Sequence, residues 1–239
     1  MLSLILPALT PLALAQDADD PIDAQRFRPA IDSEHFFAVP DTTIGPARTF
    51  GGMVMYNLAR DPVELPDGQE LDTIIAGINT VNAVGWVNLP RTRLGIDMPM
   101  HVYTTSEQYE GPGLLGDLGL EFATEIVERD RNGFGLAARV HGTLPTGNED
   151  AWLGERTGTI GGGLVGSVSA GPALLSSNIG YASGTGATVR LDETWGDRID
   201  YGFGLAYTVT PRVSVSGELV GEHIFDINAP PYVLSLIHI

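Results

Sequence analysis

The chain has 239 residues, enough for one large or two small domains, and contains no cysteine, which excludes disulfide bonds and thiolate metal sites. Its 30 acidic and 13 basic residues give a formal net charge of −17, which argues against a nucleic-acid partner because phosphate binding needs a basic surface. Glycine is abundant at 30 residues, and every basic residue is an arginine.

The first residues have the features of an export signal. Residues 1–15 are an apolar run that ends in Ala13-Leu14-Ala15, a small-x-small pattern typical of a cleavage site. The run is too short to cross a membrane as a helix, and prolines interrupt it. The basic residues that usually precede such a run are missing, since the first arginine is Arg26. We predict a signal peptide over residues 1–15 and a periplasmic leader over residues 16–47.

Nine segments of period-two alternation follow the leader. They cover about 48–59, 71–84, 91–104, 117–129, 133–144, 158–170, 173–184, 198–209 and 212–225. Strands of soluble proteins average about five or six residues, whereas these segments are roughly twice that length. Such a length is typical of a tilted strand that crosses a bilayer.

Connections between these segments alternate in length along the chain. The longer ones lie at 60–70, 105–116, 145–158 and 184–196, and the shorter ones at 85–90, 130–133, 171–172 and 210–211. This alternation is typical of an outer-membrane barrel, in which tight turns face the periplasm and long loops face outward. The sequence therefore predicts an all-β fold, an antiparallel up-and-down transmembrane β-barrel over residues 48–225.

Large apolar residues and charged residues lie on opposite faces of these segments. In the segment 91–104, Leu94 and Ile96 alternate with Arg93 and Asp97. One face can meet lipid while the other lines an enclosed interior, and only a closed barrel pairs every backbone group inside lipid. The residues predicted to line this lumen are Arg93, Asp97, His101, Glu121, Glu125, Arg139, His141 and Glu218.

Aromatic residues near the segment ends predict girdles at the two lipid–water interfaces. These residues are Tyr56, Trp86, Phe134, Tyr181, Tyr201 and Tyr207. Tyr103 has the parity of the lumen face and does not fit this pattern.

Several stretches together resemble a family of Gram-negative outer-membrane proteins. They are RFRPAIDS (26–33), FGGMVMYNLARDP (50–62), RLGIDMPMHVY (93–103), GLLGDLGLEF (113–122) and LPTG (144–147). These motifs are similar to the barrel region of OmpA-family proteins, many of which carry a C-terminal peptidoglycan-binding domain. The resemblance implies an outer-membrane location and contact with membrane lipid and lipopolysaccharide. It also implies peptidoglycan as a partner, through a domain that would follow the barrel.

The last residues predict an interrupted chain. Residues 226–239 are interpreted as a truncated loop, and their tail LSLIHI fits no earlier pattern and resembles the translation of a sequencing adapter. Single-chain bacterial barrels have even strand numbers, so about nine strands predict an incomplete barrel.

Other functional motifs are weak. The glycines of 161–166 satisfy G-x-G-x-x-G, but an alternating strand continues through them where a dinucleotide site needs a helix, so they are interpreted as lumen space or strand curvature. His101 and His141 lack the spacing of a metal or acid–base motif. Ser176, Ser177, Ser214 and Ser216 are candidate nucleophiles of a barrel-embedded lipid hydrolase, although no Gly-x-Ser-x-Gly elbow occurs.

Acidic residues of two long connections form a further hypothesis. Glu149, Asp150, Glu155, Asp192, Glu193 and Asp197 would face outward and bridge lipopolysaccharide phosphates through divalent cations. Solvated loop charge is the simpler interpretation.

The sequence thus predicts an outer-membrane barrel with a structural or passive pore and transport role, no catalysis and no cofactor. The alternatives are the lipid-modifying barrel hydrolase and a soluble secreted β-sandwich that binds a ligand.

Overall fold

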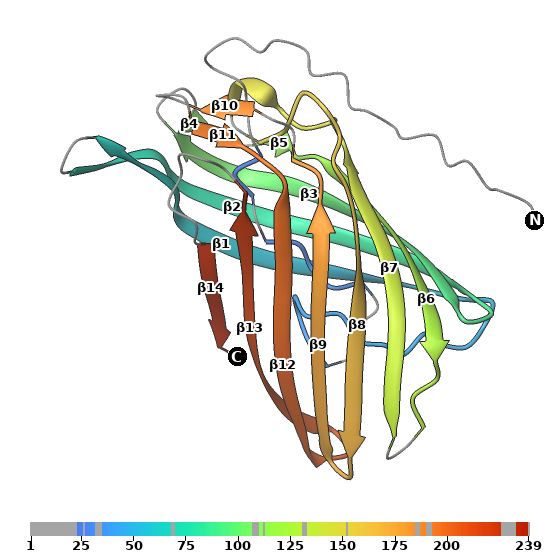
Figure 1. Cartoon of the computed structure of the whole chain (residues 1–239). Helices are drawn as coiled ribbons and strands as arrows, with labels where there is room; N and C mark the ends of the chain where they lie inside the picture. Colours follow the sequence, from blue (N-terminus) through green and yellow to red (C-terminus); the bar gives the residue numbers. More distant parts are fainter. Residues whose placement is uncertain are drawn as a thin grey trace, which may run out of the picture.

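One curled antiparallel sheet makes up most of the protein (Figure 1). The computed structural model describes residues 23–25, 27–31, 35–67, 70–106, 110–111, 113–130, 133–151, 153–184, 187–189, 193–225 and 233–238. Nine long strands follow one another in chain order and form a half-barrel. They are β1 (Thr49–Asp67), β2 (Glu70–Leu89), β3 (Thr92–Ser106), β6 (Leu118–Val127), β7 (Phe134–Leu144), β8 (Ile160–Ala170), β9 (Ala173–Ala182), β12 (Arg198–Thr210) and β13 (Val213–Ile224). The predicted all-β meander of nine strands is confirmed.

The path of the sheet ends in a tenth strand, β14 (Val233–His238), which pairs with β13. This strand comes from the tail that the sequence predicted to be artefactual. In the described part of the chain, no backbone pairing joins β1 to β14, so the half-barrel has two edges. The predicted signal peptide, residues 16–22 of the leader and residues 226–232 lie outside the described residues.

Several connections contain their own secondary structure. β4 (Glu110–Gly111) and β5 (Leu114–Leu115) pair with β3, and a 3-10 turn, η1 (Glu149–Ala151), lies between β7 and β8. β10 (Ala187–Val189) and β11 (Glu193–Trp195) form a separate two-stranded sheet. Among the described residues, no helix has the length and apolar character needed to cross a membrane.

The prediction of a long connection at 60–70 is wrong. β1 and β2 stay paired along a long hairpin as far as Asp67 and Glu70, with register shifts between Arg60 and Glu64. Proline and glycine in this stretch suggested a loop, but a β-bulge lets the ladder continue beyond such residues.

The convex face of the sheet carries large apolar side chains that remain exposed. On β12, Phe203 and Leu205 are 46% and 51% exposed, whereas their neighbours Gly204 and Ala206 are buried. Val54 on β1 is 75% exposed. The predicted alternation of the strands is therefore confirmed, and no second described layer buries this row, as a sandwich would require.

The concave face is filled by the part of the chain that precedes β1. Phe36 and Val39 pack with Leu174 of β9 and Ala206 of β12 in a buried apolar cluster. Residues 35–48 lead from this cluster to the start of β1 at Thr49. The described residues of the stretch 23–48, called the N-terminal segment below, thus lie inside the half-barrel as far as about Thr42. The sequence predicted a leader here but gave no indication of this position.

Glycines on the inner face make room for the N-terminal segment. A Cβ atom on Gly204 would lie 2.6 Å from Cε1 of Phe36, and one on Gly95 would lie 2.6 Å from Cδ1 of Ile31. Both distances are too short for real atoms, so the strands approach the segment more closely than any other residue type permits. Part of the high glycine content is explained by this contact.

A β-bulge in β3 explains the residue that did not fit the alternation. Thr80 of β2 pairs with His101, and Asn79 pairs with Tyr103, which leaves Val102 as the extra residue. The extra residue reverses the alternation, so Tyr103 points outward and is 40% exposed. Its hydroxyl donates a hydrogen bond of 2.7 Å to Glu110 at this end of the sheet.

We expect Gly204→Ala to lower the free energy of unfolding by about 1–3 kcal/mol, because the added methyl group meets the buried ring of Phe36. Gly217→Ala on the adjacent strand is the control, since a Cβ atom there has no neighbour within 4 Å. Urea unfolding of both variants in detergent micelles, followed by tryptophan fluorescence, measures the difference. Equal unfolding midpoints would contradict the packing of the N-terminal segment on β12.

Candidate functional site: the filled interior

The residues predicted to line a lumen all lie on the concave side of the sheet. Five of them are buried, namely Arg93, Asp97, His101, Glu121 and Glu218. Glu125, Arg139 and His141 are partly buried. The concave side therefore concentrates ionisable groups, which is the reverse of the usual core of a soluble protein.

Ion pairs compensate these charges along the wall. Arg93, which is 2% exposed, donates a hydrogen bond of 3.0 Å to Glu121 on the next strand. Arg139 lies 3.8 Å from the same carboxylate and 3.7 Å from Asp200 of β12. Pairing is needed because an isolated charge at these positions would carry a large desolvation cost.

Inner-face glycines of β8 and β9 allow the ion pair between Arg139 and Asp200, whose residues lie on strands that are not adjacent. Gly163 and Gly180 lie in the register row between Arg139 and Asp200, so no side chain separates the two ions. A Cβ atom on Gly180 would lie 2.7 Å from Asp200 Oδ1. Gly163 belongs to the G-x-G-x-x-G stretch, which continues as strand β8. The interpretation as interior space is supported for Gly161 and Gly163, whereas Gly162 and Gly166 share the outer face with the exposed Leu164.

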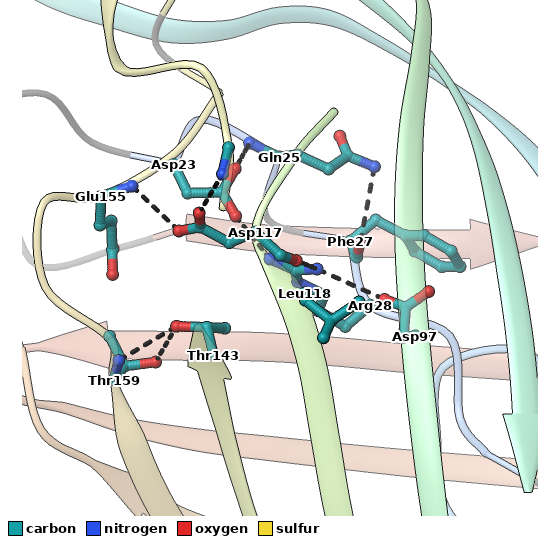
Figure 2. Close-up of polar contacts among 12 residues, drawn as sticks. Asp23, Gln25, Phe27, Arg28, Asp97, Asp117, Leu118, Thr143, Glu155 and Thr159 are labelled. Carbon is teal, nitrogen blue, oxygen red and sulfur yellow. Dashed lines mark hydrogen bonds and ion pairs between the residues drawn. The ribbon is translucent and has the colours of Figure 1, made fainter. Parts of the chain in front are cut away.

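Arg28 brings a further positive charge from the N-terminal segment (Figure 2). Its guanidinium lies 2.6 Å from the Asp23 carboxylate and 3.3 Å from Asp97. It also donates a hydrogen bond of 2.9 Å to the carbonyl oxygen of Asp117. Asp97 accepts another hydrogen bond of 2.9 Å from Asn82 of β2. Arg28 thus links the segment to strand β3 and to the start of β6.

Asp117 fixes the connection between β7 and β8 at this end of the sheet. Its carboxylate accepts backbone N–H hydrogen bonds from Thr146 (3.0 Å), Gly147 (2.8 Å) and Glu155 (2.9 Å), the last of which is visible in Figure 2. Burial raises the pKa of the Asp117 carboxyl, and the N–H groups of Glu155 and Gly147 act in the opposite direction. Asp117 therefore holds the two ends of this connection, at Thr146–Gly147 and at Glu155, close together.

Glu218 of β13 holds the middle of the N-terminal segment. Its carboxylate is 4% exposed and accepts hydrogen bonds from three successive backbone N–H groups, those of Phe37 (2.6 Å), Ala38 (2.8 Å) and Val39 (2.8 Å). Charged acceptors make such hydrogen bonds strong. The alternation predicted an inward Glu218, but its partners come from backbone atoms about 180 residues earlier, which no sequence pattern reports.

Three further contacts fix the segment beyond Val39. Ser176 donates a hydrogen bond of 2.7 Å to the carbonyl oxygen of Pro40, and Thr42 hydrogen-bonds Ser167. Arg129 pairs with Asp41 at 2.6 Å. These contacts span β8, β9 and the end of β6, so the segment is attached to several strands of the wall.

The predicted aromatic girdle is divided between the two faces. Tyr56, Phe134, Tyr181, Tyr201 and Tyr207 are exposed on the convex side. Trp86 instead shares the inner face with the buried Asn82 and Asn88, and a Cβ atom on Gly51 would collide with its ring. We therefore leave Trp86 out of the girdle. Tyr103, whose outward direction depends on the bulge at Val102, joins the exposed aromatic residues of the convex side.

The acidic loop residues do not form one outward cluster. Glu155 is only 3% exposed, so the hypothesis that it faces outward is wrong. Glu149 lies 3.5 Å from Arg156, and Asp197 accepts a hydrogen bond from Tyr181, which holds the pKa of this carboxyl below its usual range. Asp192 lies outside the described residues, and the side chains of Asp150 and Glu193 are not described either. Within the described part of the chain, no group of three or more histidine, aspartate or glutamate residues is arranged to hold a metal ion.

Two of the histidine and serine candidates have identified hydrogen-bond partners. His101 hydrogen-bonds the Thr80 hydroxyl through Nδ1 (2.9 Å), and the Ser176 hydroxyl is directed to the N-terminal segment. Ser177 and Ser214 are exposed. His101 and Ser176 thus have partners other than each other, and the hydrolase alternative stays a prediction.

Comparison with known proteins adds no identification. No family model matches the chain, and no curated protein matches it significantly. The resemblance to OmpA-family barrels therefore stays a prediction.

We expect Glu218→Ala to lower the free energy of unfolding by about 3 kcal/mol or more, because three backbone N–H groups lose their charged acceptor. Chymotrypsin should then cleave the folded protein after Phe36 or Phe37, and sequencing of the fragment ends identifies the site. Glu218→Gln keeps one acceptor oxygen and should have a smaller effect. The exposed Glu128→Gln is the charge-matched control. Wild-type protease resistance in Glu218→Ala would contradict the anchoring role.

Proposed function

We propose that the chain forms much of the wall of an outer-membrane β-barrel with a structural role in a Gram-negative cell envelope. The observation that supports this proposal is the inverted burial of the sheet. Large apolar residues such as Val54 and Leu205 are exposed on the convex face, whereas Arg93 and Glu121 are buried on the concave face. An apolar surface that extends over nine strands would be an aggregation hazard in water, whereas lipid would cover it.

The filled interior favours the structural role over the passive pore. The N-terminal segment lies against the inner wall from β3 to β13, through Ile31, Phe36 and the amides bound by Glu218. Ion pairs and ordered connections occupy further space at the end near Asp117. A continuous water-filled path would require this material to leave.

The proposed partners follow from the two faces. The convex face would contact outer-membrane lipid and, in the outer leaflet, lipopolysaccharide. Peptidoglycan binding would belong to a C-terminal domain of the kind that the resemblance implies, and no residue described above is assigned to it.

Single cysteines introduced into this cysteine-free chain test the membrane orientation of β12. We expect a fluorophore on Leu205→Cys or Phe203→Cys to be quenched by spin-labelled lipid, because these side chains point outward. The same fluorophore on Ala206→Cys, an inner-face position, should be quenched much less and serves as the matched control. Equal accessibility of all three positions to aqueous iodide would refute the membrane location.

Planar-bilayer recording separates the structural role from the pore. We expect the reconstituted full chain to give no sustained ion current, because the N-terminal segment and the ion pairs fill the interior. Glu218→Ala should give intermittent current if the released segment uncovers a path. Stable large channels in the wild type would favour the passive pore instead.

A further inference from the structure

A cavity lies between the N-terminal segment and the wall, near the end of the sheet with the β7–β8 connection. Its volume is about 240 Å³, room for a solute of about eight non-hydrogen atoms at roughly 30 Å³ each, the volume of a water molecule in the liquid. Arg28 and Ile31 of the segment line one side. His141, Asp200 and Glu222 line the opposite side, from β7, β12 and β13. This cavity is called the vestibule below.

The charge of the vestibule disfavours an anion. Six carboxylates line it: Asp23, Asp97, Glu121, Glu155, Asp200 and Glu222. Three guanidinium groups, those of Arg28, Arg139 and Arg198, line it too, and each lies within 4 Å of at least one of these carboxylates. The arginines are thus already engaged by carboxylates, and negative charge is in excess.

Two of the carboxylates belong to residues that are neighbours across the β12–β13 ladder, and each lies within 4 Å of an arginine. Asp200 and Glu222 are opposed cross-strand partners on β12 and β13, an arrangement that is unfavourable for like charges. The Arg139 guanidinium lies 3.7 Å from Oδ2 of Asp200. A cation next to Asp200 would relieve this repulsion.

Hydrogen-bond acceptors without partners lie in the same wall. Asp200 Oδ1 and Asn178 Oδ1 are buried and have no hydrogen-bond partner among the described residues. Gln25 is 2% exposed and lines the vestibule from the side of the N-terminal segment, and its Oε1 atom also has no hydrogen-bond partner among the described residues. Buried acceptors carry a cost unless a donor reaches them. The Nδ1 atom of His141, in the same lining, also has no partner among the described residues. The three oxygen atoms outnumber it and call for a group with several N–H donors.

We infer that the vestibule binds a small organic cation that carries guanidinium or primary ammonium groups, with Asp200 as the main charge partner and Asn178 and Gln25 as acceptors. A bare metal ion fits less well, because within the described residues no set of three suitable ligands converges. The net charge of −17 attracts cations to the protein in general, and the vestibule adds directed acceptors. This inference rests on the filled interior that the proposed function uses.

Calorimetric titration of the full chain, folded in detergent micelles, with agmatine tests the inference. We expect saturable binding by the wild type and about tenfold weaker binding by Asp200→Asn, because the charge-assisted hydrogen bonds are lost. Asn178→Ala, which removes a neutral acceptor, should also weaken binding. Glu128→Gln, the exposed control, should bind as the wild type does. Circular dichroism of each variant confirms that the sheet has formed.

Tetramethylammonium, a cation without N–H donors, separates directed binding from bulk attraction. We expect it to bind at least tenfold more weakly than agmatine. Three results would each overturn the inference: equal affinity for the two cations, no effect of Asp200→Asn, or no agmatine binding by the folded chain. The last result would mean that water satisfies the acceptors. A chain that folds and stays in the membrane fraction without binding agmatine refutes the vestibule alone. A chain that binds agmatine but partitions into the aqueous fraction refutes only the proposed location.

Discussion

The compensation of charge on the concave face is the constraint on which the structure depends. Arg93, Asp97 and Glu218 are almost fully buried there, and each would be costly without a partner. Cross-strand pairs such as Arg93–Glu121 satisfy part of this requirement. The remainder is met by atoms from outside the sheet, since the guanidinium of Arg28 reaches Asp97 and three backbone amides reach Glu218. The N-terminal segment is therefore the second half of the core.

This arrangement connects the fold to the proposed role in the envelope. A sheet with an apolar convex face needs a lipid or protein cover, and a charged concave face needs water, a ligand or its own chain. Here the chain supplies its own filling over much of the interior, and the glycines at 95 and 204 are adapted to it. What is left open is small and lies near the β7–β8 connection, where the carboxylates are in excess.

Local periodicity could predict the strands, because an exposed row of Tyr201, Phe203 and Leu205 opposite small residues is a property of adjacent positions. It could not predict the bulge at Val102, since one inserted residue leaves no compositional mark and yet turns Tyr103 outward. The position of the N-terminal segment could not be predicted either. Its contacts are backbone amides and close packing against strands that lie far away in the sequence, and neither leaves a local pattern. The same applies to Glu155, whose loop context suggested exposure while Asp117 draws its backbone inward. Local patterns predict which face of the sheet a side chain lies on. The filling of the interior depends on contacts between residues far apart in the sequence.

The hydrogen bonds between Glu218 and the amides of residues 37–39 have a consequence for assembly. The two partners lie about 180 positions apart, so the second half of the core cannot form until nearly the whole wall has been synthesised. Contacts of such long range make folding slow, because the entropy of closing the intervening chain is lost before any contact compensates for it. A nascent chain would thus expose its uncompensated carboxylates and its apolar strands until the wall is complete. A chaperone that binds the unfolded chain matters most during this interval.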